Sequence, residues 1–210
     1  YTRRLSLDSA IATSTYEVNG VTYKKEYFTS FGTDVDIIRV TADKPHQINC
    51  SVSISRPERV AVSASNNVLQ MQGQLDNGTD GKGMKYLAKV KAIAKDGIQQ
   101  TEGNNLVIKN ASELIIYISE KTDYKDPAYQ KEVDDLLTKA VHQSYEKEKQ
   151  QHIAAFQKLY KRVYVNLGKS RDDLPTDERL QAFQKNPQDN NGLAVLFYQF
   201  GRYLSISSTR

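Results

Sequence analysis

Tryptophan is absent from this 210-residue sequence, and cysteine occurs only once. A single cysteine excludes an intrachain disulfide and a thiolate metal cluster. It lies in the alternating run Ile48-Asn49-Cys50-Ser51-Val52, a strand-like pattern that predicts a buried, unreactive thiol. Dedicated sugar-binding surfaces rely on large aromatic rings, so the missing tryptophan argues against such a surface, although the chain has 13 tyrosines.

Long apolar runs and a strong excess of charge are missing too. The longest apolar stretches, residues 114–118 and 193–200, are too short to span a bilayer, so no membrane insertion is expected. The net charge of +4 comes from 29 basic and 25 acidic residues spread along the whole chain, which disfavours nucleic acid as a partner. The chain opens on Tyr1 without an initiator methionine or an apolar leader. We therefore expect the true N-terminus to lie elsewhere, and the cellular location stays open.

The carboxylates form no recognisable catalytic or metal-binding pair. Thr176 is predicted to be the N-cap of a helix whose first turn holds Asp177 and Glu178. Neighbours on a helix point about 100° apart, so these two acids cannot flank a substrate. Asp34 and Asp36 are predicted to share one face of a strand, but no third ligand follows at a useful spacing. A solvated sheet edge is the favoured interpretation.

Other candidate motifs fail in the same way. The glycine-rich residues 76–83 predict a long connection between strands, because no helix follows that could point its N-terminus at a phosphate. Residues 146–149, Glu-Lys-Glu-Lys, predict a solvated helix face. No two of the three histidines have the four-residue spacing of a zinc-binding helix; they are His46, His142 and His152. We therefore predict neither a metal site nor a cofactor.

Up to about residue 121 the apolar residues recur with the period of two that is typical of strands. Residues 17–23 predict two strands joined by a tight turn at Asn19 and Gly20. Residues 85–95 predict a long strand with apolar side chains on one face and lysines mainly on the other. Many short strands with frequent turns indicate an antiparallel sandwich.

Beyond residue 127 the apolar spacing becomes helical. One helix is predicted over residues 133–141. A second carries apolar residues as far as Val163, with Gly168 following its end. A last helix over residues 193–209 has an apolar stripe made of Leu193, Leu196, Phe197, Phe200 and Leu204. Strands followed by helices indicate an α+β chain with a boundary near residues 124–127.

Several segments together resemble glycoside hydrolase family 95, the α-L-fucosidases. Residues 1–8 and 20–30 are similar to the middle of its N-terminal β domain, although the family has aspartate where Ser6 stands and arginine where Lys25 stands. The segment from His152 to Gly168 resembles its helical linker, but Ala155 replaces a family aspartate.

The two most specific matches lie near the end of the chain. Residues 174–180, Leu-Pro-Thr-Asp-Glu-Arg-Leu, match a family motif letter for letter. Residues 197–204 with Ser207-Ser208-Thr209-Arg210 are similar to the first helix of the catalytic barrel. In that helix we expect Gly201 to permit close helix packing and Arg202 to pair with a nearby acid. A direct sugar contact by Arg202 or Arg210 is the alternative.

The resemblance implies a specific organisation. The fold class is α+β: an antiparallel β-sandwich, incomplete relative to the family's super-sandwich, followed by a helical linker and the first helix of an (α/α)6 barrel. Residues 1–123 would be the C-terminal part of the N-terminal sandwich, 124–187 the linker and 188–210 the first helix of a truncated barrel. The family's catalytic acid, and the aspartate and asparagines that activate water, lie on the barrel beyond this chain. The resemblance therefore assigns no catalytic, substrate-binding or metal-binding residue here.

The function implied for the parent is that of an inverting glycosidase, which releases terminal α-linked L-fucose from an oligosaccharide or polysaccharide. The resemblance also implies a periplasmic or secreted bacterial protein. The piece itself is predicted to be inactive, and to self-associate, because missing strands leave unpaired edges. Two alternatives stay open: a parent α-L-galactosidase, and a non-catalytic carbohydrate-binding or assembly module.

Overall fold

The computed structural model describes residues 1–209, apart from the side chain of Asp189, and within that range the strands precede the helices. The strands are β1 Thr2–Ser6, β2 Ile11–Val18, β3 Val21–Thr29, β4 Asp36–Ala42, β5 Ile48–Val52, β6 Ala61–Ser65, β7 Val68–Gln74, β8 Lys85–Lys95, β9 Ile98–Glu102, β10 Asn105–Ala111 and β11 Glu113–Thr122. The helices are α1 Tyr129–Val141, α2 Tyr145–Tyr160, α3 Thr176–Lys185 and α4 Gly192–Ser208, with a short 3-10 helix, η1, at Pro187–Asp189.

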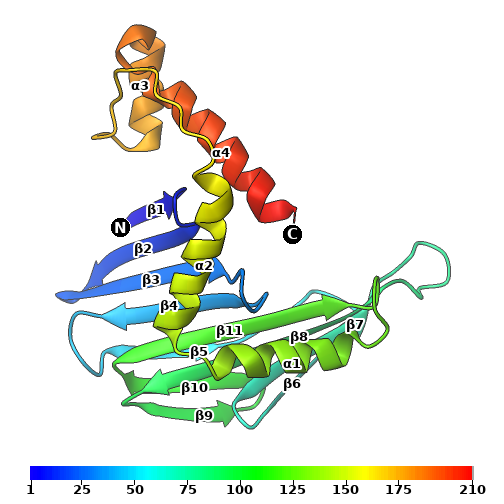
Figure 1. Ribbon diagram of the computed structural model, residues 1–210. Helices are drawn as coiled ribbons and strands as arrows, with labels where there is room; N and C mark the ends of the chain where they lie inside the picture. Colours follow the sequence, from blue (N-terminus) through cyan, green and yellow to red (C-terminus); the bar gives the residue numbers. More distant parts are fainter. Residues whose placement is uncertain (210) are drawn as a thin grey trace. The chain divides into compact units, whose positions relative to one another are not determined.

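These strands form two mainly antiparallel sheets (Figure 1). The larger sheet has the order β1-β2-β3-β4-β11-β8-β7-β6, and the smaller has the order β5-β10-β9. The turn between β2 and β3 is made by Asn19 and Gly20, with φ angles of 53° and 69°. Two successive left-handed residues are what a type I′ hairpin turn needs, so the predicted hairpin is confirmed.

Residues from both sheets form one hydrophobic core. Its buried members are Val40, Ile48, Leu69, Val90, Ala92, Leu106, Ile108, Ala111 and Leu114. The long strand β8 contributes Val90 and Ala92 from one face, as its alternation predicts. The expected fold class, an antiparallel sandwich followed by helices, is confirmed.

The opposite face of the larger sheet is covered in part by α1 (Figure 1). Leu87 of β8 packs with Tyr129 and Val133 of α1, and all three side chains are buried. Beside them, Lys89 of β8 forms an ion pair with Asp134 of α1. The apolar spacing of residues 133–141 therefore marks the face with which α1 packs on the sheet.

The chain divides into two compact units. The first comprises Tyr1–Leu5 with Ile11–His152, and therefore holds both sheets, α1 and the first half of α2. The second comprises Ser6–Ala10 with the segment from Ile153 onward, and holds the second half of α2, α3, η1 and α4. Among the described residues, no helix is both long and apolar enough to cross a membrane.

Two predicted helix ends are wrong. The N-cap of α3 is Pro175, whose side chain makes no capping hydrogen bond, so Thr176 is the first helical residue. The acidic first turn at Asp177 and Glu178 is as expected. Helix α2 ends at Tyr160, three residues before Val163, and Gly168 lies too far along the chain to cap it.

Candidate functional site

A buried carboxylate on α2 contacts the turn between β3 and β4. Glu148 is fully buried, so the prediction that residues 146–149 form a solvated face is wrong at this position. Its Oε1 accepts hydrogen bonds from the hydroxyls of Ser30 and, at 2.6 Å, Thr33. Its Oε2 has no hydrogen-bond partner among the described residues. A carboxylate held in this way fixes a helix on a turn, and no substrate could reach it.

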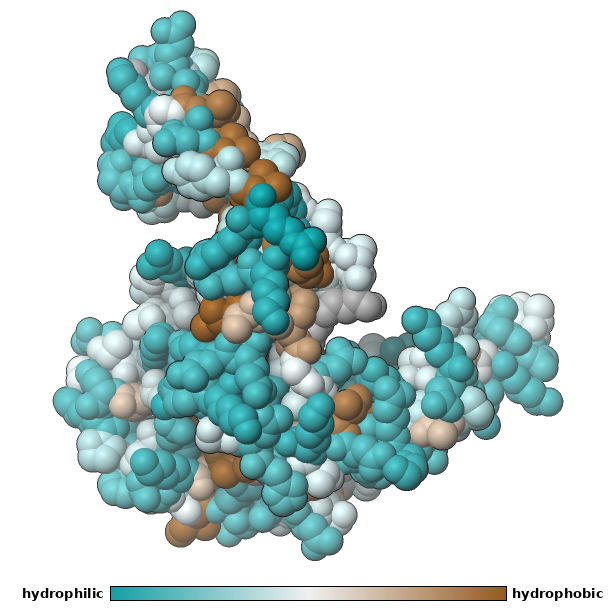
Figure 2. All heavy atoms as spheres, in the orientation of Figure 1, coloured by the Kyte–Doolittle hydropathy of each residue, from teal (hydrophilic) through white to brown (hydrophobic). Residues whose placement is uncertain are grey.

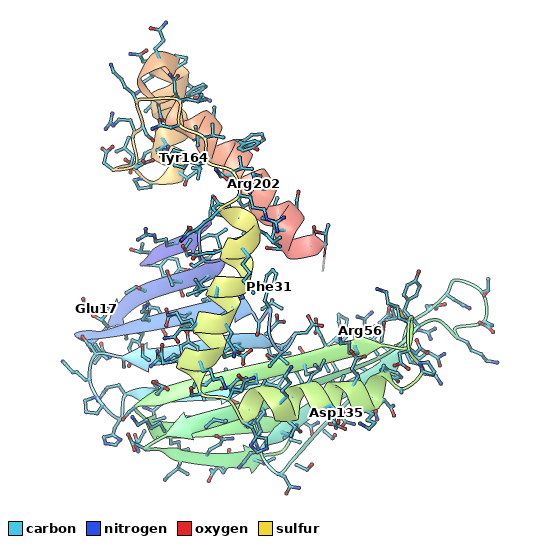
Figure 3. The ribbon with its side chains drawn as sticks, viewed as in Figure 1. Glu17, Phe31, Arg56, Asp135, Tyr164 and Arg202 are labelled. Carbon is cyan, nitrogen blue, oxygen red and sulfur yellow. The ribbon has the colours of Figure 1, made fainter. Side chains whose placement is uncertain are left out.

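His152 lies one helical turn further along α2 and is also buried. Its ring lies 4.8 Å from that of Phe28 and 5.7 Å from that of Phe31, which is labelled in Figure 3. Its environment is therefore largely aromatic. Among the described residues, no group of three or more His, Cys, Asp or Glu side chains could hold a metal ion.

A second buried carboxylate, Glu26 of β3, is surrounded by basic side chains. Its Oε1 lies 2.8 Å from Nζ of Lys149 and 3.2 Å from Nζ of Lys24, and its Oε2 lies 3.8 Å from Arg39. The hydroxyl of Tyr145 donates to Oε2 over 3.2 Å. Burial by itself would raise the pKa of Glu26, but Lys149 and then Lys24 outweigh it and lower the pKa below its usual value.

The same network affects the tyrosine. Burial, and then the negative charge of Glu26, raise the pKa of Tyr145 well above its ordinary value, so its phenol stays protonated and keeps donating. Because α2 covers these groups, they bind the helix to β3 and β4 and form no open acid–base site.

An open groove lies on the sandwich side of the larger sheet, next to the edge of β5. Tyr16, Tyr23 and Tyr27 line it, and the rings of Tyr16 and Tyr23 stack with centroids 5.2 Å apart. Cys50 of β5 also lines the groove and is exposed. The prediction of a buried thiol is therefore wrong, because β5 has no neighbouring strand on its groove side within the described residues.

The left-handed backbone of Asp34 explains another wrong prediction. Asp34 has a φ of 53° and lies in the turn before β4, whereas Asp36 is the first residue of that strand, so the two do not share a strand face. Asp34 pairs with Lys121, and Asp36 accepts a hydrogen bond from Thr29. Both carboxylates are thus engaged at the surface.

The glycine-rich loop connects β7 to β8, as predicted. The side-chain oxygen of Asn77 accepts hydrogen bonds from the backbone N–H groups of Thr79, Asp80 and Gly81, over 3.1 to 3.2 Å. These donors are therefore used within the loop, and the next element is a strand.

In the second unit, Arg202 of α4 reaches the end of α2 (Figure 3). Its guanidinium donates to the carbonyl oxygens of Tyr160 at 2.8 Å, Leu159 at 3.2 Å and Val163 at 3.3 Å. It also donates to Oε1 of Gln199 at 2.8 Å. Its carbon lies 5.0 Å from the centre of the Tyr160 ring. The prediction that Arg202 pairs with a nearby acid is therefore wrong, since backbone carbonyl oxygens accept its hydrogen bonds instead.

The rest of α4 exposes much of its predicted apolar stripe, which Figure 2 shows along the helix. Phe197 is 81% exposed, and Phe200 and Leu204 are also exposed. Gly201 is expected from the sequence to allow another helix to pack closely. Within the described residues, however, there is only open space around the position that its Cβ atom would take. A hydrophobic face of this kind fits packing against further protein. Arg210 lies outside the described residues.

Two family models match the chain in succession. Residues 1–127 match "Glycosyl hydrolase family 65, N-terminal domain", and residues 144–210 match "Glycosyl hydrolase family 95 catalytic domain". The chain belongs to glycoside hydrolase family 95. This family 95 chain spans 29% of the length of the curated relative that it matches.

That relative is "Alpha-L-fucosidase 2" from Arabidopsis thaliana, 26% identical over an alignment of 251 positions that includes all of this chain. The comparison with solved structures found "Putative kojibiose phosphorylase from human microbiome", at 13% sequence identity and a TM-score of 0.48. The aligned region covers 76% of the family 95 chain and 24% of that structure's chain.

Sequence reasoning missed the roles of Glu26, Glu148 and Arg202 in the family 95 chain. Glu26 and Glu148 lie in charged runs, and nothing in their spacing distinguishes them from solvated residues. Arg202 is the single charged residue of α4, but its neighbours in the sequence do not indicate its partners. The partners of Glu148 lie 118 and 115 positions away, so no local pattern could have identified them.

Proposed function

We propose that this chain is a non-catalytic fragment of an inverting hydrolase that releases terminal α-linked L-fucose from glycans. The observation that supports the proposal is the match of the whole chain to an α-L-fucosidase. The geometry agrees with it: among the described residues, the buried carboxylates are engaged in hydrogen bonds to hydroxyls and a tyrosine and in ion pairs with lysines. None stands opposite a second carboxylate across an open site, as the two groups of a glycosidase must.

We also propose which part of the parent enzyme each segment of the chain forms. Residues 1–123 act as the C-terminal part of the N-terminal sandwich, 124–187 as a helical linker and 188–210 as the first helix of the catalytic barrel. The catalytic groups of the parent then lie outside this chain, and no residue of it is assigned to catalysis, substrate binding or metal binding. The exposed stripe of α4 supports this view, because a barrel helix needs neighbours on its apolar face.

The test compares the piece with its parent. The purified 210 residues should release no L-fucose from 2′-fucosyllactose, whereas the parent reading frame, extended at both ends, should release it. An L-galactoside assayed in parallel distinguishes a fucosidase from an α-L-galactosidase, whose substrate differs only by a hydroxyl on C6. Turnover by the piece would refute its non-catalytic role, and an inactive parent would refute the fucosidase assignment.

A binding role is the second candidate, and the tyrosine-lined groove beside β5 is the observation that favours it. Isothermal titration of the chain with 2′-fucosyllactose would detect it. We further propose that the chain self-associates, since β5 presents an unpaired edge and α4 an apolar face.

A further inference from the structure

We propose that Arg202 is a positioning residue: its guanidinium closes the C-terminal end of α2 and so fixes α4 to that end. All the contacts involved lie within the second compact unit. The inference stands apart from the fucosidase proposal, because it concerns only contacts that this chain makes with itself.

The first step is the way in which α2 ends. The last carbonyl groups of a helix have no partner inside the helix and need one from elsewhere. A glycine just past the end is the usual solution, but Gly168 is eight positions beyond Tyr160. Arg202 supplies the partner instead, because it binds the carbonyl oxygens of Leu159 and Tyr160 together with that of Val163. The helix ends at the residues whose carbonyl oxygens accept hydrogen bonds from this side chain.

The second step is the charge. A helix C-terminus carries partial negative charge, so a cation placed there is stabilising. The ring of Tyr160 adds a cation–π contact from the same helix end. An arginine suits this place better than a lysine, since its planar fork can reach several carbonyl oxygens at once and still stack on a ring.

The third step concerns the alternative of a sugar contact. Both terminal nitrogens of Arg202 already donate two hydrogen bonds each, which uses the four N–H groups they carry. Of the five donors only the single Nε–H remains, so a sugar hydroxyl could receive at most one hydrogen bond from Arg202 unless α2 gave up its cap. The structure therefore favours a role through the position of α4 over direct substrate contact.

The experiment measures hydrogen exchange in the 210-residue chain by mass spectrometry. The amide of Lys161 donates to the carbonyl of Gln157, and that of Arg162 to the carbonyl of Leu159, so both report on the last turn of α2. In Arg202→Ala we expect these amides to exchange about tenfold faster, the effect of losing a hydrogen bond to a charged group. In Arg202→Lys we expect less than half of the protection to return, because a point charge replaces the fork.

Arg162→Ala is the matched control. Arg162 is an exposed arginine at the same helix end, and its Nε donates to a single carbonyl, that of Lys158, over 3.0 Å. We expect its removal to change exchange less than about threefold, as for other surface contacts. Exchange in β8, within the other unit, should stay unchanged in every variant.

Three results would overturn the inference. The first is native exchange at Lys161 and Arg162 in Arg202→Ala, and the second is full protection in Arg202→Lys. The third is a slowing of exchange around Arg202 when L-fucose is added to the unsubstituted chain, since that would reveal a sugar ligand. If Arg202→Ala fails to fold, the lysine variant, which keeps the charge, still decides between the fork and a simple cation.

Discussion

Replacing Glu26 by glutamine tests whether buried charge binds α2 to the sheet. The side chain of Glu26 is 9% exposed and lies within 4 Å of three cationic side chains: Lys24, Arg39 and Lys149. Glutamine keeps the size and one carbonyl oxygen, but removes the charge that those cations face. The substitution therefore isolates the electrostatic contribution from the packing.

The expected loss follows from the exposure of the partners. Removing one member of a fully buried pair costs about 3–5 kcal/mol, because an uncompensated charge stays behind. Here Lys149 and Arg39 are 24% and 23% exposed, so water can solvate them partly once the carboxylate is gone. We expect Glu26→Gln to lower the free energy of unfolding of the first unit by about 2–3 kcal/mol at pH 7.

The pH dependence has a definite sign. Since the pKa of Glu26 is lowered in the folded chain, its contribution is fully present above the unfolded value of about 4.3 and is lost as the pH falls through the folded pKa. Urea unfolding followed by circular dichroism at pH 7 and at several values below 4.3 should show the difference between the native chain and Glu26→Gln shrinking. Glu17→Gln, on exposed β2 sequence, is the control and should change little at any pH.

A loss at pH 7 smaller than about 0.5 kcal/mol, the size of an ordinary surface effect, would refute the reasoning. So would a loss of the same size at pH 7 and at pH 3, because it would then arise from packing and not from charge.

Three further outcomes are expected. Gly201→Ala should raise the stability of the unit that holds α4 by about 1 kcal/mol in thermal unfolding, because a Cβ atom meets open space there; a decrease would restore the close-packing interpretation. Gly73→Ala should lower stability by about 1–3 kcal/mol, since its Cβ would stand 2.0 Å from the carbonyl oxygen of Arg59, and an unchanged urea midpoint would contradict this. Light scattering should find the chain self-associated, and Phe197→Ser, at a side chain 81% exposed, should reduce the associated fraction; a monodisperse native monomer would refute the proposal.

The sequence by itself determined the local conformations of this family 95 chain. The period of two located strands such as β8, and the period of three to four located α1 and α4, because these periods follow from the backbone geometry of each element. The turn at Asn19 and Gly20 followed from the φ angles that those two residue types tolerate. Local physics was sufficient for these features.

Tertiary structure alone decided which residues are buried and where α2 ends. Cys50 alternates like a core residue and is exposed, because no described strand pairs with the edge of β5 that faces away from β10. Glu148 stands in a charged run and is buried, because Ser30 and Thr33 bring hydroxyls to it. Arg202 ends α2 from 42 positions beyond Tyr160. The physical reason is common to all three: whether a side chain is buried, and which partners it finds, depends on segments that are distant in sequence, and periodicity carries no information about them.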